Sequence, residues 1–136
     1  MNNYSMKMSS PDKDDVDVEL LESSFTFHDY TEIVEQFAYT CQIMKMEDSF
    51  YVYIGQSENE RMDGLIYAFL SAYDNLPVAV RLTGLAEQEW SLSLASRLTA
   101  LSGKHVYISC NLEVPCYLKV AIGKRVTAEF KKHMIS

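Results

Sequence analysis

Histidine and cysteine are the residue types in this sequence that could carry catalysis or bind a metal. The histidines are His28, His105 and His133, and none belongs to an HxxxH, HExxH or Cys/His arrangement with zinc spacing. The cysteines are Cys41, Cys110 and Cys116, and they form no CxxC pair. A thiol at the start of a helix can have a lowered pKa, so Cys110 and Cys116, which flank a predicted strand-to-helix junction, are candidate nucleophiles. No histidine is placed to activate them, and we interpret them as packing residues.

Phosphate-binding and hydrolase motifs are also missing from the sequence. It contains no GxGxxG, GxxxxGK[ST] or GxSxG. The acidic pairs Glu47–Asp48 and Glu87/Glu89 fall in a turn and in the first turn of a predicted helix, where carboxylates act as solvated caps. We therefore predict no catalytic residue, no cofactor-binding residue and no metal ligand.

The charge of the chain is acidic and unevenly distributed. The formal net charge is −7; residues 1–63 hold fourteen acids and four bases (−10), and residues 64–136 hold five acids and eight bases (+3). Nucleic acids and anionic membranes attract basic surfaces, so we expect neither as a partner. Three widely spaced cysteines indicate reduced thiols in a cytosolic or nuclear protein. We also expect no secretory signal and no membrane span.

The sequence predicts a tail followed by one domain. Residues 1–22 are polar and then acidic, so we predict a disordered tail, with an acidic docking arm for a basic partner as the alternative. Residues 23–136 are predicted to form a single α+β domain. We expect an antiparallel sheet of about six strands, with strands first and then helix, strand, helix. Both helices are expected to pack on one face of the sheet.

Alternation with period two predicts the strands. Ile33, Phe37, Tyr39, Cys41 and Ile43 alternate with polar residues and predict a single strand. The stretches "FYVYIG", "VAVRLTG" and "KHVYISCNL" predict three more. "LIYAFLSAY" fits either a helix or a strand, and a hairpin with the preceding strand favours a strand.

Helical spacing predicts two helices near the end of the chain. Leu94, Leu98 and Leu101, with Ala95 beside them, predict one that ends at Gly103. Pro115 is expected in the first turn of the other, whose apolar stripe is Leu118, Ala121, Ile122, Val126 and Phe130. This last helix also has a basic side, formed by Lys119, Lys124, Arg125, Lys131 and Lys132. We interpret that side as solvated, with a contact surface for an acidic protein as the alternative.

The strand within "MEDSFYVYIG" (residues 46–55) is apolar on both faces. A strand with one face in solvent would instead alternate apolar with polar residues. Phe50, Val52 and Ile54 suit the helix side, whereas Tyr51 and Tyr53 suit a protein interface. We place Tyr51, Tyr53 and Tyr67 in a candidate partner interface. Two helices can cover only one face, so either a second chain packs on the other face or the sheet curls into a small barrel.

Four blocks of the sequence resemble the proteasome assembly chaperone 4 family. They are "DSFYVYIG", "SAYDNLPVAVRLTG", "LASRLTALSGKHVYISCNL" and "IGKRVTAEF", in the family's order and spacing over most of residues 45–130. None of these blocks is a signature by itself, and the acidic tail has no counterpart in the short family members.

The resemblance implies both a fold and a function. The family fold is an antiparallel sheet with helices on one side, without enzymatic activity or a cofactor. Members pair with proteasome assembly chaperone 3, and the heterodimer binds α-type subunits, promotes α-ring assembly of the core particle and leaves as β subunits arrive. A homodimer in the absence of the partner is a further expectation. A small adaptor subunit of a trafficking or signalling complex is the alternative function, and an enzyme that uses Cys110 or Cys116 is the third class.

Overall fold

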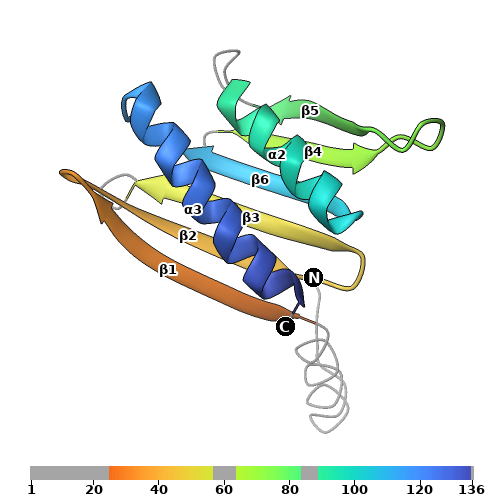
Figure 1. Ribbon diagram of the computed structural model, residues 1–136, viewed down its shortest axis with the longest axis horizontal. Coiled ribbons are helices and arrows are strands. Elements are labelled where there is room, and N and C mark those ends of the chain that lie inside the picture. Colours follow the sequence, from red (N-terminus) through yellow and green to blue (C-terminus); the bar gives the residue numbers. More distant parts are fainter. Residues whose placement is uncertain (1–24, 57–63, 84–88, 136) are drawn as a thin grey trace, which may run out of the picture.

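A computed structural model of the chain describes residues 25–56, 64–83 and 89–135 (Figure 1). The elements are β1 (Thr26–Val34), β2 (Phe37–Lys45), β3 (Ser49–Gln56), β4 (Leu65–Leu70), β5 (Pro77–Thr83), α2 (Glu89–Ser102), β6 (His105–Asn111) and α3 (Cys116–Ile135). This is the predicted α+β order of strands followed by helix, strand and helix. Within these ranges, neither helix is long and apolar enough to cross a membrane. The predicted tail, residues 1–22, lies outside the described residues.

The six strands form one sheet in the order β1-β2-β3-β6-β4-β5. All neighbours are antiparallel except β3 and β6, which run parallel. The ambiguous stretch at residues 65–70 is a strand, but the predicted hairpin with the preceding strand is wrong. The chain returns through α2 and inserts β6 between β3 and β4, as a parallel pair requires a long crossover. β3 and β6 are therefore central strands.

One predicted strand is in fact two. The stretch from Ile33 to Ile43 is broken by a turn at Glu35, whose φ is 58°, and Val34 pairs with Phe37 across that turn. Ile33 therefore belongs to β1 on the face opposite Tyr39, and its side chain is 71% exposed. Glycine, asparagine and aspartate are the usual residues with positive φ, so Glu35 gave no signal of a turn.

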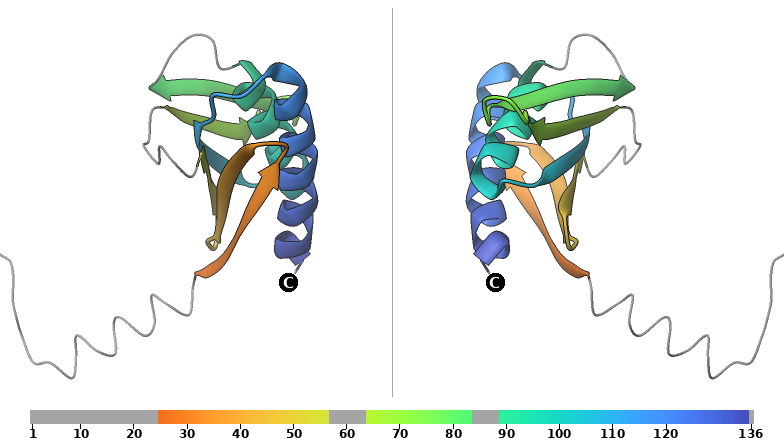
Figure 2. Two further views of the ribbon diagram at one scale, coloured as in Figure 1. Left: turned by 90° about the vertical axis from the view of Figure 1, so that its left-hand side faces the viewer. Right: turned by 90° about the vertical axis from the view of Figure 1, so that its right-hand side faces the viewer.

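The core lies between the sheet and the two helices, which pack on the same face (Figure 2). Phe50, Val52 and Ile54 are fully buried there, as their parity predicted, and the ring of Phe50 lies 4.6 Å from that of Phe130. Gly103 ends α2 with a φ of +70°, and its N–H donates to the Thr99 carbonyl at 2.8 Å. Two predicted stripe residues, Leu101 and Ala121, are exposed instead.

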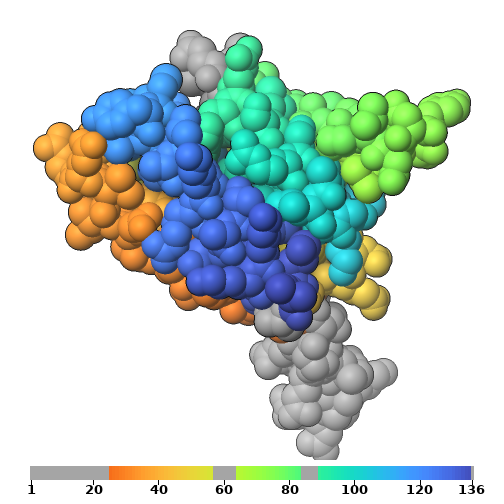
Figure 3. Space-filling model, viewed as in Figure 1, coloured from red at the N-terminus to blue at the C-terminus, as the bar shows by residue number. Residues whose placement is uncertain are grey.

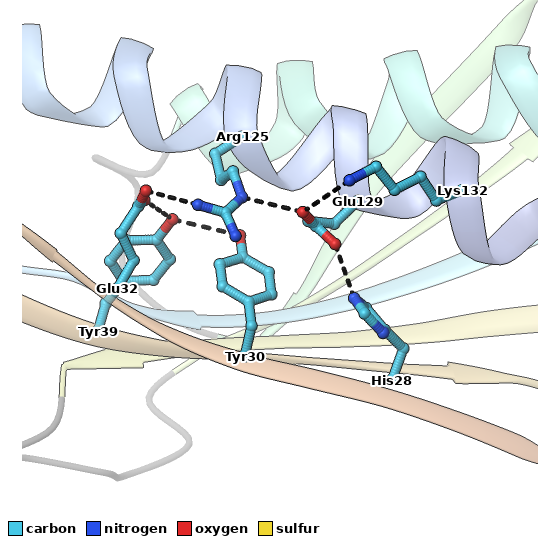
Figure 4. A network of polar contacts seen from close by, with 7 residues as sticks. All are labelled: His28, Tyr30, Glu32, Tyr39, Arg125, Glu129 and Lys132. Atoms are coloured by element: carbon cyan, nitrogen blue, oxygen red, sulfur yellow. Dashed lines mark hydrogen bonds and ion pairs between the residues drawn. The ribbon is translucent and has the colours of Figure 1, made fainter.

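A network of polar side chains connects the edge strand β1 to α3 (Figure 4). The carboxylate of Glu129, 9% exposed, accepts from His28 Nε2 at 2.8 Å and from Arg125 Nε at 3.0 Å. Arg125 also binds Glu32 at 2.6 Å, and its guanidinium carbon lies 4.5 Å from the centre of the Tyr30 ring. These contacts bring together residues about a hundred positions apart.

The groups of this network satisfy one another, which favours a structural role over a catalytic one. Tyr39 donates to Glu32 at 2.6 Å, and the Tyr30 and Tyr39 hydroxyl oxygens lie 3.2 Å apart. The hydrogen bond from His28 lowers the pKa of Glu129, and Arg125 lowers it further, so Glu129 is ionised at neutral pH. A buried carboxylate with several charged donors fixes the position of β1 against α3.

We expect Glu129→Ala to lower the free energy of unfolding by roughly 2 kcal/mol. This is less than the cost of removing one partner from a fully buried ion pair, because Arg125 reaches solvent and stays hydrated without Glu129. The matched control is Lys132→Ala. Lys132 lies 3.6 Å from the same carboxylate but is 74% exposed, so its loss should cost less than about 0.5 kcal/mol. Urea denaturation at pH 7 measures both, and equal losses would contradict this role of Glu129.

Stability should decline as pH falls below about 6.5, because of His133. Burial lowers the pKa of His133 below its ordinary value of 6.5; the backbone contact with Thr26 opposes this shift, and nearby His28 and Lys45 add to it. The unfolded chain then binds more protons than the folded one below that pH. Glu129 has a lowered pKa, so its contribution is lost in a separate window, below its ordinary value of 4.5. Unfolding free energies from pH 7.5 to 5 should fall less steeply in His133→Gln, and parallel slopes would refute this assignment.

Candidate protein-binding face

The face of the sheet opposite the helices, here called the open face, has one apolar row that crosses every strand. The strand register aligns the side chains Phe27, Met44, Tyr51, Tyr107, Tyr67 and Val80. Five steps between strands at about 4.8 Å make this row roughly 24 Å long. That length is close to the side of a patch of about 800 Å², the share of one partner in a standard protein interface.

Aromatic rings are stacked at the centre of the open face. The ring of Tyr67 lies 4.9 Å from that of Tyr107 and 5.2 Å from that of Phe69. It also stacks on His105 at 5.6 Å, and its hydroxyl lies 2.6 Å from His105 Nδ1. Desolvation and the neighbouring Tyr107 raise the pKa of Tyr67, so this hydroxyl stays protonated. Rings held in this way lose little freedom when a partner binds.

Tyr53 lies flat on its own strand. A Cβ on residue 55 would overlap the Tyr53 hydroxyl, so Gly55 leaves the space that the ring occupies. Tyr53 faces Ser109 across the β3–β6 register, and Ser109 is fully buried. Tyr53 therefore belongs to the floor of the open face.

The structure places all three predicted interface residues on the open face. Tyr51 and Tyr67 stand in the apolar row with Tyr107 between them, and Tyr53 lies one step further along β3. The predicted interface omitted Tyr107 and the apolar residues of β5. Val78, Val80 and Leu82 share one parity on β5, and Leu82 is 51% exposed. These three residues alternate with Ala79 and Arg81 in the sequence, and this period-two pattern could have placed them on one face of the strand.

A hollow of about 310 Å³ opens at the β1 end of the row. Its lining includes Phe27, Met44 and Tyr51. The barrel alternative is wrong, because β1 and β5 are the two ends of an open sheet. Both helices among the described residues lie on the other face (Figure 2), so packing against a second chain remains our hypothesis for an apolar row of this length.

The side chains considered for chemistry are not gathered into a reactive site. Burial raises the pKa of the Cys110 thiol to about 11, which makes it a poor nucleophile at neutral pH. Cys116 is exposed at the start of α3. Among the described residues, no three His, Cys, Asp or Glu side chains are placed to hold a metal ion. What the open face can do is bury apolar area against another surface.

Comparisons with known proteins agree on one family. The family model for proteasome assembly chaperone 4 matches residues 38–112, more than half of the 136 residues. Human proteasome assembly chaperone 4 is 34% identical over 71 residues, 52% of this chain and 56% of the human protein. The mouse protein of that name is 34% identical over 70 residues, 52% of this chain and 55% of its own length. The match thus spans about half the length of these relatives.

A solved structure shares the fold. A chain from the crystal structure of a novel chaperone complex for yeast 20S proteasome assembly aligns with a TM-score of 0.64. The alignment covers 82% of this chain and 98% of that chain, at 14% sequence identity. At this identity the likeness concerns the fold alone.

Substitutions on neighbouring strands distinguish the two faces of the sheet. Ile66→Ala, on the helix side of β4, should cost about 2–5 kcal/mol, because it leaves a cavity in the core. Val80→Thr keeps a β-branched side chain on the open face and should change stability by no more than about 0.5 kcal/mol. Thermal or urea unfolding of the isolated protein measures both. If Val80→Thr were as destabilising as Ile66→Ala, the open face would already be packed in the single chain.

Proposed function

Because this chain belongs to the proteasome assembly chaperone 4 family, we propose that it promotes assembly of the α-ring of the proteasome core particle. In this proposal it acts by binding alone, without catalysis and without a cofactor. The observation that carries the proposal is the family match over residues 38–112, which includes β3, β4, β6 and therefore the centre of the open face.

We propose that the open face binds proteasome assembly chaperone 3 to form a heterodimer. Tyr51, Tyr53 and Tyr67, with Tyr107, would form the centre of that contact. Tyrosine suits an interface that is exposed until the partner arrives, because its ring buries apolar area while its hydroxyl tolerates water. Without the partner, the same row would pair two copies of this chain, since identical apolar patches can associate about a twofold axis.

The heterodimer would bind α-type proteasome subunits, hold the correct neighbours together, and leave as β subunits join. Such a release needs no nucleotide. A competitor that binds the same site ten times more tightly has an advantage of about 1.4 kcal/mol, and this displaces most of the chaperone at equal concentrations. The proposed location is the cytoplasm, together with the nucleus.

A small adaptor of a trafficking or signalling complex is the alternative function. A sheet with two helices occurs in proteins of unrelated function, so the fold supports both candidates equally. The family match favours the assembly chaperone.

Affinity capture of the tagged full-length chain from cells, with mass spectrometry, tests this function. We expect α-type subunits and one small sheet protein in excess over mature β subunits. The double substitution Tyr51→Asp with Tyr67→Asp should remove the small partner, because burying two carboxylates in an apolar contact is costly.

The control for this capture is Leu101→Asp, which places the same charge on an exposed apolar residue of α2. It should leave the captured set unchanged. Capture of a different set of proteins by the wild-type chain would refute the chaperone function. Undiminished capture of the small partner by the double variant would refute only the choice of face.

A further inference from the structure

A groove of about 450 Å³ runs between α2 and α3, on the side of the helices that faces away from the sheet (Figure 3). Its apolar floor includes Trp90 and Val120. A Cβ on residue 123 would lie 3.2 Å from Trp90 Nε1, so Gly123 allows the indole to approach α3 closely. The volume is within the range of roughly 300–1,000 Å³ that is usual for ligand sites.

Three cations line this groove: Arg97 on α2, and Lys124 and Lys131 on α3. All three are exposed, and within residues 25–56, 64–83 and 89–135 none is paired with a carboxylate. The neighbouring cations differ, because Arg125 and Lys132 bind Glu129 on the sheet side of α3. The groove therefore combines an apolar floor with unpaired positive charge, a combination that fits an acidic segment with aliphatic side chains.

The chain contains such a segment. Residues 14–22 read DDVDVELLE, in which acids alternate with Val16, Val18 and Leu20. In an extended segment, alternate side chains point to opposite sides, so one set can face the floor while the other faces the cations. We propose that residues 14–19 of this segment bind the groove between α2 and α3 of the same molecule. This inference does not depend on the proposed chaperone function.

The segment is long enough to reach the groove. The described chain begins beside the last turns of α3, where Thr26 Oγ1 lies 3.2 Å from His133 Nε2, and Lys131 lies two residues before His133. The six residue steps from Glu19 to Phe25 can span up to about 20–22 Å. Half the circumference of a helix about 10–12 Å across is roughly 16–19 Å. The tether can therefore pass around α3 to its outer side.

Weak intrinsic affinity is enough for a tethered segment. A short linker gives an effective concentration on the order of 1 mM, so a segment whose free form binds with a Kd of about 0.1 mM is bound about 90% of the time. The salt dependence should be strong, because three exposed cations supply the attraction.

Trp90 is the single tryptophan of the chain, so its fluorescence reports directly on the groove. The test is acrylamide quenching of full-length variants. Neutralisation of the segment by Asp14→Asn, Asp15→Asn, Asp17→Asn and Glu19→Gln should raise the quenching constant about twofold, because Trp90 loses the cover of a segment that was bound most of the time. About 1 M NaCl, where the Debye length is about 3 Å, should do the same to the wild type.

Matched controls separate this effect from a change of overall charge. Asp29→Asn, Glu47→Gln, Asp48→Asn and Glu113→Gln remove four exposed charges elsewhere and should leave quenching unchanged. Lys131→Glu, in the groove, should raise quenching, and Lys119→Glu, on the same helix outside it, should not.

Two results would overturn the proposal. The first is equal quenching of the wild type and the variant with the neutralised segment, which would mean that the segment does not cover Trp90. The second is protection that disappears on dilution, which would mean that the segment binds another copy of the chain. Protection that is independent of protein concentration supports binding within one molecule.

Discussion

The two helices in the described part of the chain are too narrow to cover both faces of the six-stranded sheet, and the packing of that part follows from this limit. Helices pack about 8–10 Å apart, and six strands extend over roughly 24 Å. α2 and α3 therefore cover one face, and the core forms there. The residues of the opposite parity must suit either water or another chain. Their row of aromatic and aliphatic side chains suits another chain.

Parity within a strand was readable from the sequence, whereas the order of the strands was not. In β3 the two parities separate into Phe50, Val52 and Ile54 on the core side and the tyrosines on the other, as the sequence predicted. The insertion of β6 between β3 and β4 depends on a crossover through α2, which no local pattern encodes. For this reason the stack of Tyr67 on Tyr107 became visible only in the structure.

The two surfaces of the molecule differ in kind. The open face is aromatic and stacked, and the groove between α2 and α3 is apolar in its floor and cationic around it. Apolar contact is non-directional and is not screened by salt, which suits a lasting pairing. Contacts between exposed charges are screened and readily exchanged, which suits a segment that must come and go. The assembly and release that we propose for this protein would use both.

The polar network on β1 is explained by register. Phe27 and Ile33 of this edge strand are exposed on the open face, so apolar burial alone does not fix where β1 lies along β2. A slip by two residues would keep the same faces and change every partner. A slip would move His28 away from Glu129 and Glu32 away from Arg125, so the hydrogen bond and the ion pair between β1 and α3 form together in one register only. The charges thus specify the position of β1, and with it one end of the apolar row.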